Sequence, residues 1–262
     1  MVDLIVHFAS MVGMSLNVKK CKVLCLHTNS PSIVVGNEVM EQVTSFRYLG
    51  SEISVPADAS AEVSLRISRA QAAFSMLSPC LWSRSDISVK TKCHVFTAAV
   101  RSVLLYGCET WPLRSCDVKR LSVFEHNCLR KILRISILDH VQISDLYKRG
   151  NISIPIDAVI VQRRWSWLGH VLRMNSDQLP KRAFFTAGLS SWKRPRGGPK
   201  TTWCRVVKSE AENYLGYKFL PYWTTRWKDY LADIASNRQA WAGVQRDVIA
   251  QVAGDGQLRP TT

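Results

Sequence analysis

A stretch of the chain without carboxylates carries the side chains best suited to bind a polyanion. Between Asp177 and Glu210 there are basic and aromatic residues but no acidic one. Each lysine or arginine that neutralises a phosphate releases a condensed counterion, so this composition favours nucleic acid as the partner. The basic residues are Lys181, Arg182, Lys193, Arg194, Arg196, Lys200, Arg205 and Lys208, and the aromatic ones are Phe184, Phe185, Trp192 and Trp203.

The sequence RPRGGP at residues 194–199 predicts a loop, because its prolines and glycines are incompatible with a helix. A cationic loop rich in glycine can follow a sugar-phosphate backbone, and a tryptophan beside it can stack on an unpaired base for roughly 1–3 kcal/mol. We therefore expect the strongest contacts with nucleic acid here. The candidates are Trp192, Lys193, Arg194, Arg196, Lys200 and Trp203.

Residues 156–174 must position this loop, and their spacing predicts an amphipathic helix after Pro155. Arg163 and Arg164 fall off its apolar face and are further candidates for contacts with nucleic acid. Gly169 would cost roughly 1 kcal/mol relative to alanine in a helix interior, so we expect another segment to pack closely against it. The apolar residues that recur at steps of three, four and seven are Ile156, Ile160, Trp167, Val171 and Met174.

Five colinear blocks resemble the region downstream of the polymerase domain in reverse transcriptases of non-LTR retrotransposons. Together they run from about residue 12 to about residue 208. The resemblance implies a fragment that comprises the end of the palm, the thumb and part of the region C-terminal to the thumb. The blocks are LNVKKCKVLCL, FRYLGSEIS, LLYGCETWPLR, FEHNCLRKIL, and RRWSWLGHVLRM together with WKRPRGGPKTTW.

The FRYLGS block resembles the palm hairpin that supports the primer end. The resemblance implies that Phe46, Arg47, Tyr48, Leu49 and Gly50 form this hairpin, with Gly50 allowing a close approach to the sugar-phosphate chain. The alternative is that Phe46 and Tyr48 share the buried face of a strand.

Thumb helices in this family would lie along the minor groove of the template-primer duplex. The resemblance therefore implies a set of phosphate contacts, although each of them could also be a solvated helix charge. The residues in question are Arg66, Arg69, Lys90, Lys92 and Arg101.

The family's catalytic metal site has no counterpart in the sequence. Its two metal ions are held by palm carboxylates, two of them adjacent, because phosphoryl transfer needs charge neutralised on the attacking and leaving oxygens together. The chain contains no Asp-Asp pair. Residues 1–20 match either the helix after the metal-binding turn or, with a gap, the turn itself, with Asp3 as one aspartate and Leu4 in place of the other. On both alignments we expect no catalytic residue, no bound metal or other cofactor, and no polymerisation by this chain alone; Mg²⁺ would belong to the missing part of the palm.

The charge is unevenly distributed along the chain. There are 35 lysines and arginines against 20 aspartates and glutamates, a net charge of +15. Residues 1–60 carry four basic and five acidic side chains, residues 61–140 carry twelve and six, and residues 141–262 carry nineteen and nine. The nucleic-acid surface is therefore expected in the later parts, with a solvated basic surface that binds nothing as the alternative.

The eight cysteines match neither a disulfide framework nor a common zinc module. The chain has no Cys-X-X-Cys, and Cys108, Cys116, His126 and Cys128 are spaced unlike zinc ligands. We expect buried free thiols in an intracellular protein, with nucleus or cytoplasm left open. No uncharged run approaches eighteen residues, so no membrane partner is expected.

The fold class expected is α+β, mainly α. Short apolar runs broken by turn residues predict strands over residues 17–54, including a hairpin over residues 34–39, and helical spacing begins after residue 56. Helices are expected to begin near Asp58, Asp86, Asp117 and Thr202. The predicted parts are 1–56, the end of the palm; 57–150, a thumb-like bundle; 151–192, the amphipathic helix and basic connector; 193–253, the basic loop and C-terminal helices; and 254–262, a disordered tail.

Three functional hypotheses remain at the level of sequence. The chain is a piece of a reverse transcriptase that grips RNA and DNA as template-primer, with the missing polymerase portion as a further partner. Alternatively, it is an independent nucleic-acid-binding protein retained after the element decayed, or a nonfunctional product of a degenerate copy. A self-sufficient fold would favour independence, whereas exposed edges in the palm remnant would weaken it.

Overall fold

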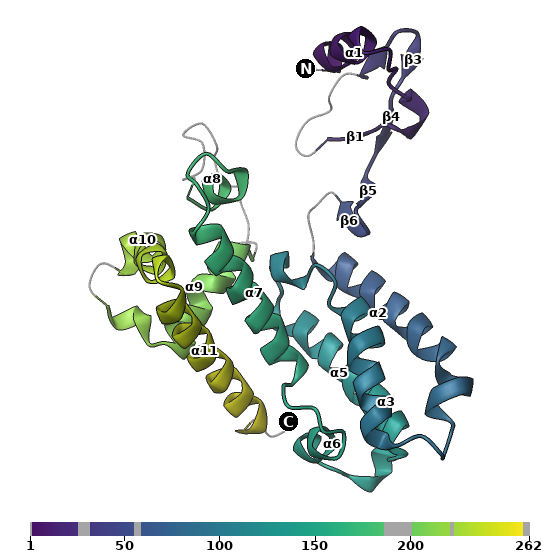
Figure 1. Cartoon of the computed structure of the whole chain (residues 1–262), viewed down its shortest axis with the longest axis vertical. Helices are drawn as coiled ribbons and strands as arrows, with labels where there is room; N and C mark the ends of the chain where they lie inside the picture. The colour runs from purple at the N-terminus through teal and green to yellow at the C-terminus, as the bar shows by residue number, and fades with distance from the viewer. Residues whose placement is uncertain (1, 26–31, 55–58, 186–200, 221–222, 259–262) are drawn as a thin grey trace. The chain divides into compact units, whose positions relative to one another are not determined.

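The chain is mainly helical, with short strands at its N-terminal end, which confirms the expected α+β class (Figure 1). The computed structural model describes residues 2–25, 32–54, 59–185, 201–220 and 223–258. The chain divides into two compact units, Met1–Glu62 and Val63–Thr262. This division lies near the expected end of the palm-like part at residue 56, whereas the finer boundaries at residues 150 and 192 remain predictions.

The first unit contains one helix and three pairs of short strands among its described residues. Strands β1 and β4 pair in parallel, whereas β2 with β3 and β5 with β6 are antiparallel. The β2–β3 pair confirms the hairpin predicted over residues 34–39, and Gly36 at φ +61° supplies its turn. The elements are α1 (Val2–Met11), η1 (Val18–Lys20), β1 (Lys22–Leu24), β2 (Val34–Val35), β3 (Glu38–Val39), β4 (Glu41–Val43), β5 (Ser45–Tyr48) and β6 (Ser51–Ser54).

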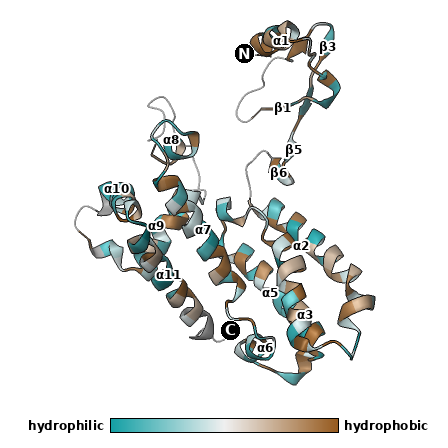
Figure 2. Cartoon of the chain, viewed as in Figure 1, coloured by the Kyte–Doolittle hydropathy of each residue, from teal (hydrophilic) through white to brown (hydrophobic). Residues whose placement is uncertain are grey.

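The described residues of the first unit form almost no hydrophobic core of their own. Met40 is the one buried apolar side chain among the described residues before the start of α2. Helix α1 buries none of its residues, although it is largely apolar (Figure 2). Leu4, Ile5, Phe8 and Met11 are each more than half exposed. Most of the free energy that burial of these apolar side chains could supply is therefore not gained within the unit.

The second unit is built from helices and short helical turns. Its elements begin with α2 (Ala59–Met76), whose first turn still belongs to the first unit. The rest are η2 (Ser78–Trp82), α3 (Val89–Val95), η3 (Phe96–Arg101), α4 (Ser102–Leu104), η4 (Cys108–Thr110), α5 (Ser115–Leu133), η5 (Ile137–Asp139), α6 (Ile143–Arg149), α7 (Ile156–Leu172), α8 (Leu179–Phe185), α9 (Trp203–Tyr214), η6 (Tyr217–Phe219), α10 (Trp223–Ser236) and α11 (Arg238–Leu258).

Local capping signals explain where several of these helices begin. Ser88 Oγ accepts a hydrogen bond from the Thr91 backbone N–H at 3.1 Å at the start of α3, and Thr202 does the same for Arg205 at the start of α9. Helix α5 begins at Ser115, two residues before the predicted start, because Asp117 caps from inside the first turn. The helix expected to begin near Asp86 begins at Val89 with α3 and continues through the π-helical segment η3 into α4.

Helix α7 is the central helix of the second unit, and the face it buries is broader than the one expected. It contacts α5 and η4 as well as α10 and α11, and Figure 1 shows it between these two groups of helices. Ser166 and His170 are exposed on its opposite side. The predicted apolar residues lie on part of the buried face, which extends further because α7 packs against two groups of helices. The buried side chains form one continuous face: Ile156, Ala158, Ile160, Val161, Arg164, Trp165, Leu168, Val171 and Leu172.

The close contact expected at Gly169 is confirmed. The indole of Trp241 on α11 lies over this glycine, so a Cβ atom there would collide with the Trp241 Nε1. Trp241 also stacks on Trp165, with ring centroids 5.5 Å apart, at the centre of the core shared by α7 and α11. Helix α11 extends to Leu258, so it includes the first residues of the tail expected to be disordered from residue 254. The rest of that tail lies outside the described residues, and its disorder stays a prediction.

Candidate nucleic-acid interface

Strands β5 and β6 form the hairpin that corresponds to the FRYLGS block. Leu49 and Gly50 make its turn, with φ of +48° and +84°. Both values are positive, as in the tight turns that suit two-residue hairpins, and the leucine is held in a conformation that L-residues seldom adopt. Tyr48 is 56% exposed and Leu49 75% exposed, whereas Phe46 is half-buried. Phe46 and Tyr48 thus do not share a buried face, and Arg47, also exposed, lies on the same surface hairpin.

Arg164, one of the predicted contacts on α7, has a structural position instead. Its side chain is buried and forms an ion pair with Glu210 on α9. The second carboxylate oxygen of Glu210 accepts a hydrogen bond from Trp165 Nε1 at 2.9 Å. Burial raises the pKa of Glu210, and the Arg164 guanidinium opposes that rise. The prediction that Arg164 contacts nucleic acid at the surface was therefore wrong. We assign this residue to the packing contact between α7 and α9.

Arg163, the neighbouring candidate, lines a surface groove of about 560 Å³. One wall of this groove is α3 with η3, and the other is the segment from Gly150 to Ile154 together with α7. Lys90, His94 and Arg101 line it as well, and no described lining residue is acidic. We call this the α3–α7 groove. It brings together three residues expected to meet nucleic acid, Lys90, Arg101 and Arg163. Lys90 and Arg163 are separated by more than seventy positions in the sequence.

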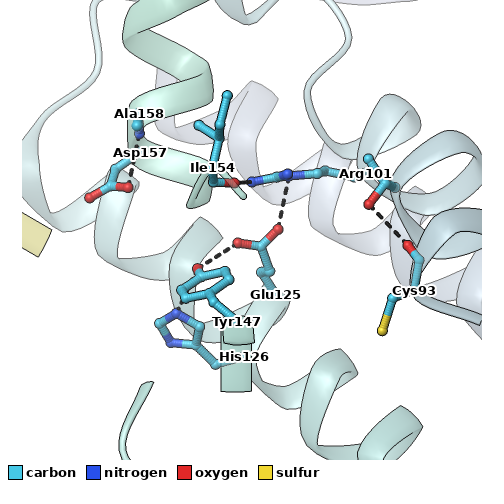
Figure 3. A network of polar contacts seen from close by, with 9 residues as sticks. Cys93, Arg101, Glu125, His126, Tyr147, Ile154, Asp157 and Ala158 are labelled. Carbon is cyan, nitrogen blue, oxygen red and sulfur yellow. Dashed lines mark hydrogen bonds and ion pairs between the residues drawn. The ribbon is translucent and has the colours of Figure 1, made fainter. Parts of the chain in front are cut away.

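A buried polar network fixes one side of the α3–α7 groove (Figure 3). Arg101 donates to the backbone oxygen of Ile154 at 2.7 Å and forms an ion pair with Glu125 at 2.9 Å. Tyr147 donates its hydroxyl hydrogen to Glu125 at 2.7 Å, and His126 Nε2 lies 3.0 Å from the same hydroxyl. The network thus ties η3, α5 and α6 to the loop that forms the second wall, so the groove is held in shape before any ligand arrives.

Burial controls the protonation of this network. It raises the pKa of Glu125, and the charge of Arg101 and the Tyr147 hydrogen bond oppose the rise. It also raises the pKa of the Tyr147 phenol, in the same direction as the charge of Glu125. Burial, assisted by the positive charge of Arg130, lowers the pKa of His126 from 6.5 to about 4. His126 is therefore neutral in the folded protein at physiological pH.

We expect this histidine to make the second unit less stable in acid. Between about pH 6.5 and pH 4 the unfolded chain binds a proton at His126 that the folded chain does not, so stability is lost as pH falls through this window, by up to about 3 kcal/mol. Chemical unfolding of wild type and His126→Gln at pH 7 and pH 4.5 measures the difference. Glu125 titrates in the opposite sense but is common to both proteins. Equal pH dependence of the two proteins would refute this assignment.

Most of the predicted cationic loop lies outside the described residues. This applies to Trp192, Lys193, Arg194, Arg196 and Lys200, so their part in binding stays a prediction. Trp203, at the first position of α9, is half-buried and donates from Nε1 to the backbone oxygen of Glu109 at 2.7 Å. Its ring also meets Phe184 edge to face. The structure thus gives Trp203 a packing role that sequence did not indicate.

The cations expected along the thumb helices fall into two groups. Arg66, Lys92 and Arg101 are buried, and Lys92 donates from Nζ to the backbone oxygen of Trp82 at 3.1 Å. They therefore act mainly within the fold, because a buried charge must be satisfied by its own protein. Lys90 is exposed and Arg69 is half-buried. Of the five, Lys90 is the one that is both exposed and part of the α3–α7 groove.

Buried thiols were expected at the cysteines, but only Cys93, Cys108 and Cys128 are buried. Cys80 and Cys116 are exposed, and the other three cysteines are half-buried. Burial raises the pKa of the Cys93 and Cys108 thiols to about 11 and that of Cys128 to about 12. These three thiols stay protonated at neutral pH and are poor nucleophiles. Among the residues that the structure describes, no three His, Cys, Asp or Glu side chains gather as metal ligands would.

Comparisons with known proteins give no independent assignment. No protein-family model matches the chain, and no curated protein or solved structure is significantly similar to it. None of the described helices is both long enough and apolar enough to cross a membrane.

His94 and the segment 150–154 are parts of the groove that sequence reasoning missed. A lone histidine in a helix carries no local signal, and the loop is short and contains no charged residue. Asn151, with φ +53°, holds this loop in a left-handed turn after α6. The one available signal was the cluster of basic residues over the helices that precede residue 105, which does not say which of them face the same groove.

Proposed function

We propose that this chain is part of a reverse transcriptase of the non-LTR retrotransposon type. It binds the template-primer duplex and does not itself catalyse polymerisation. The observation that carries the proposal is the α3–α7 groove, which collects Lys90, His94, Arg101 and Arg163 without an acidic residue among its described lining. The colinear sequence blocks support the family, and the absence of an Asp-Asp pair from the sequence supports a binding role rather than a catalytic one.

The composition of the groove suits a sugar-phosphate backbone better than an apolar ligand. Lys90 and Arg163 can neutralise phosphates, and the Thr91 and Ser153 hydroxyls and the Asn151 amide can hydrogen-bond to sugars or phosphate oxygens. Arg163 is held in place because it donates from Nη1 to the backbone oxygen of Leu105 at 2.8 Å. Such contacts fix the register of a duplex without reading its sequence.

The exposed apolar residues of α1 support the view that the first unit is part of a larger domain. Contiguous apolar side chains at a protein surface mark an interaction site. The partner we propose is an apolar polypeptide face of the kind a complete palm would offer, packed on Leu4, Ile5, Phe8 and Met11. The second unit differs, because its helices enclose a core that includes the fully buried Trp165 and Leu168. That core favours the alternative function, an independent nucleic-acid-binding protein, for the second unit alone.

Two double variants with the same net charge test whether the groove binds nucleic acid. Lys90→Gln with Arg163→Gln removes two groove cations, and Lys218→Gln with Arg246→Gln removes a lysine and an arginine from exposed positions elsewhere. Binding to a labelled RNA–DNA template-primer is measured across a salt series by fluorescence anisotropy. Each lost phosphate contact lowers the salt slope by about 1, so the groove variant is expected to lose about 2 and the control much less. Equal losses would mean that only net charge matters and would contradict the groove assignment.

A further inference from the structure

A second pocket, unrelated to the α3–α7 groove, lies at the C-terminal half of α5. It has a volume of about 470 Å³, and Gln71 of α2 and the turn after α5 line it beside α5. We call it the α5 pocket. Its size falls within the range of sites for small molecules and cofactors. None of the residues that line the groove lines this pocket.

The α5 pocket joins an apolar wall to a cationic rim. Phe124, Cys128, Ile135 and Ile137 supply the apolar wall. Arg130, Lys131 and Arg134 supply three positive charges, and no acidic residue lies among the described lining residues. Gln71 and Asn127 add two side-chain amides, each with donors and an acceptor. A ligand that matches all three features has a flat, mostly apolar body with a polar edge and carries a negative charge at one end.

Three cations gather at the end of α5, because Arg130 and Lys131 lie in its last turn and Arg134 is its C-terminal cap residue. Arg134 is anchored at the rim, because its Nη2 donates to the backbone oxygen of Ser83 at 3.1 Å. The C-terminal end of α5 carries a partial negative charge of about one half of an elementary charge, which three full positive charges outweigh. The local field therefore attracts an anion.

We propose that the α5 pocket binds one nucleoside phosphate unit, with the base on the apolar wall and the phosphate on the cationic rim. The amides of Gln71 and Asn127 would then meet the polar edge of the base. The unit can be a free nucleotide or an unpaired nucleotide of a bound strand, and the second case rests on the proposed function. An acidic peptide has charge but lacks the flat base, so it fits the amide-lined apolar wall less well.

The test measures binding of AMP to the full chain by equilibrium dialysis, beside adenosine, inorganic phosphate and a single-stranded adenylate pentanucleotide. Two matched pairs of variants report on the pocket. Ile137→Glu places a carboxylate at a pocket residue that is 71% exposed, and Leu138→Glu places one at its neighbour, 77% exposed and outside the lining. Lys131→Gln removes a rim charge, and Lys119→Gln removes an exposed charge of the same helix away from the pocket. Circular dichroism confirms that each variant is folded.

We expect AMP to bind more tightly than adenosine or phosphate, and Ile137→Glu and Lys131→Gln each to weaken it about tenfold, with both control variants unchanged. Competition between the pentanucleotide and AMP would assign the pocket to a strand; AMP binding without competition would assign it to a free nucleotide. No AMP binding, equal weakening by control variants, or displacement only by an acidic peptide would overturn the proposal. The groove variant Lys90→Gln with Arg163→Gln should leave AMP binding intact, so failure of the pocket and failure of the groove are distinguishable.

Discussion

Replacement of Glu210 by leucine is expected to lower the free energy of unfolding by about 3–5 kcal/mol. The substitution leaves the buried Arg164 guanidinium without its carboxylate and leaves Trp165 Nε1 without an acceptor. Arginine cannot escape this cost by losing its proton, because a guanidinium stays charged in proteins. Denaturant unfolding followed by tryptophan fluorescence measures the change. A loss below about 1 kcal/mol would show that the buried pair contributes little to the packing contact between α7 and α9.

Replacement of Arg164 by methionine, the other half of this test, is expected to cost less. Glu210 has a pKa already raised by burial, and without Arg164 it can take up a proton and become neutral. A carboxyl group whose folded pKa exceeds its unfolded value gives stability that is lost as pH rises, so the variant should be closer to wild type at pH 5 than at pH 8. The double variant should lower the free energy of unfolding by less than the sum of the two single variants.

The ion pair between Lys208 and Glu212, at 3.9 Å, is the control. Lys208→Gln should change the free energy of unfolding by less than about 0.5 kcal/mol.

Gly169→Ala is expected to destabilise the second unit by about 1–3 kcal/mol, although alanine is the better helix former. The new methyl group would collide with the Trp241 indole, which is buried and stacked on Trp165. Gly243→Ala on α11 is the matched control, because nothing lies within 4 Å of the added Cβ atom. It should stabilise the protein by roughly 0.5–1 kcal/mol. Thermal unfolding measures the change in stability of both variants. Stabilisation by both substitutions would contradict the observed packing of α7 on α11.

The sequence predicted those features of the fold that depend on local chemistry. Helix starts near Asp86 and Thr202 were predictable because a short polar side chain before a helix satisfies a backbone N–H within three residues. The turn at Gly36 and the close contact at Gly169 were predicted for a similar reason, since glycine in such places is costly unless the backbone or a neighbour requires it. The breadth of the buried face of α7 could not be predicted in this way, because it depends on contacts with helices that are distant in the sequence.

The candidate interface shows the same division between local and distant information. Lys90 and Arg163 were each identified as candidates, but only the fold brings them to one groove. Arg164 was misassigned because helical spacing cannot distinguish an arginine on the surface from one paired with a carboxylate forty-six residues later. The network of Arg101, Glu125 and Tyr147 joins three segments and has no signature in any of them.

Binding of the purified full chain to an RNA–DNA template-primer across a fourfold range of salt tests the central claim most directly. If about five phosphates are neutralised, the affinity should fall a few hundredfold over this range. A variant with Lys193, Arg194, Arg196 and Lys200 changed to glutamine should bind more weakly and with a shallower salt slope. It keeps the groove cations but loses four positive charges of the loop. Weak binding that neither salt nor the variant changes would contradict a role in template-primer grip.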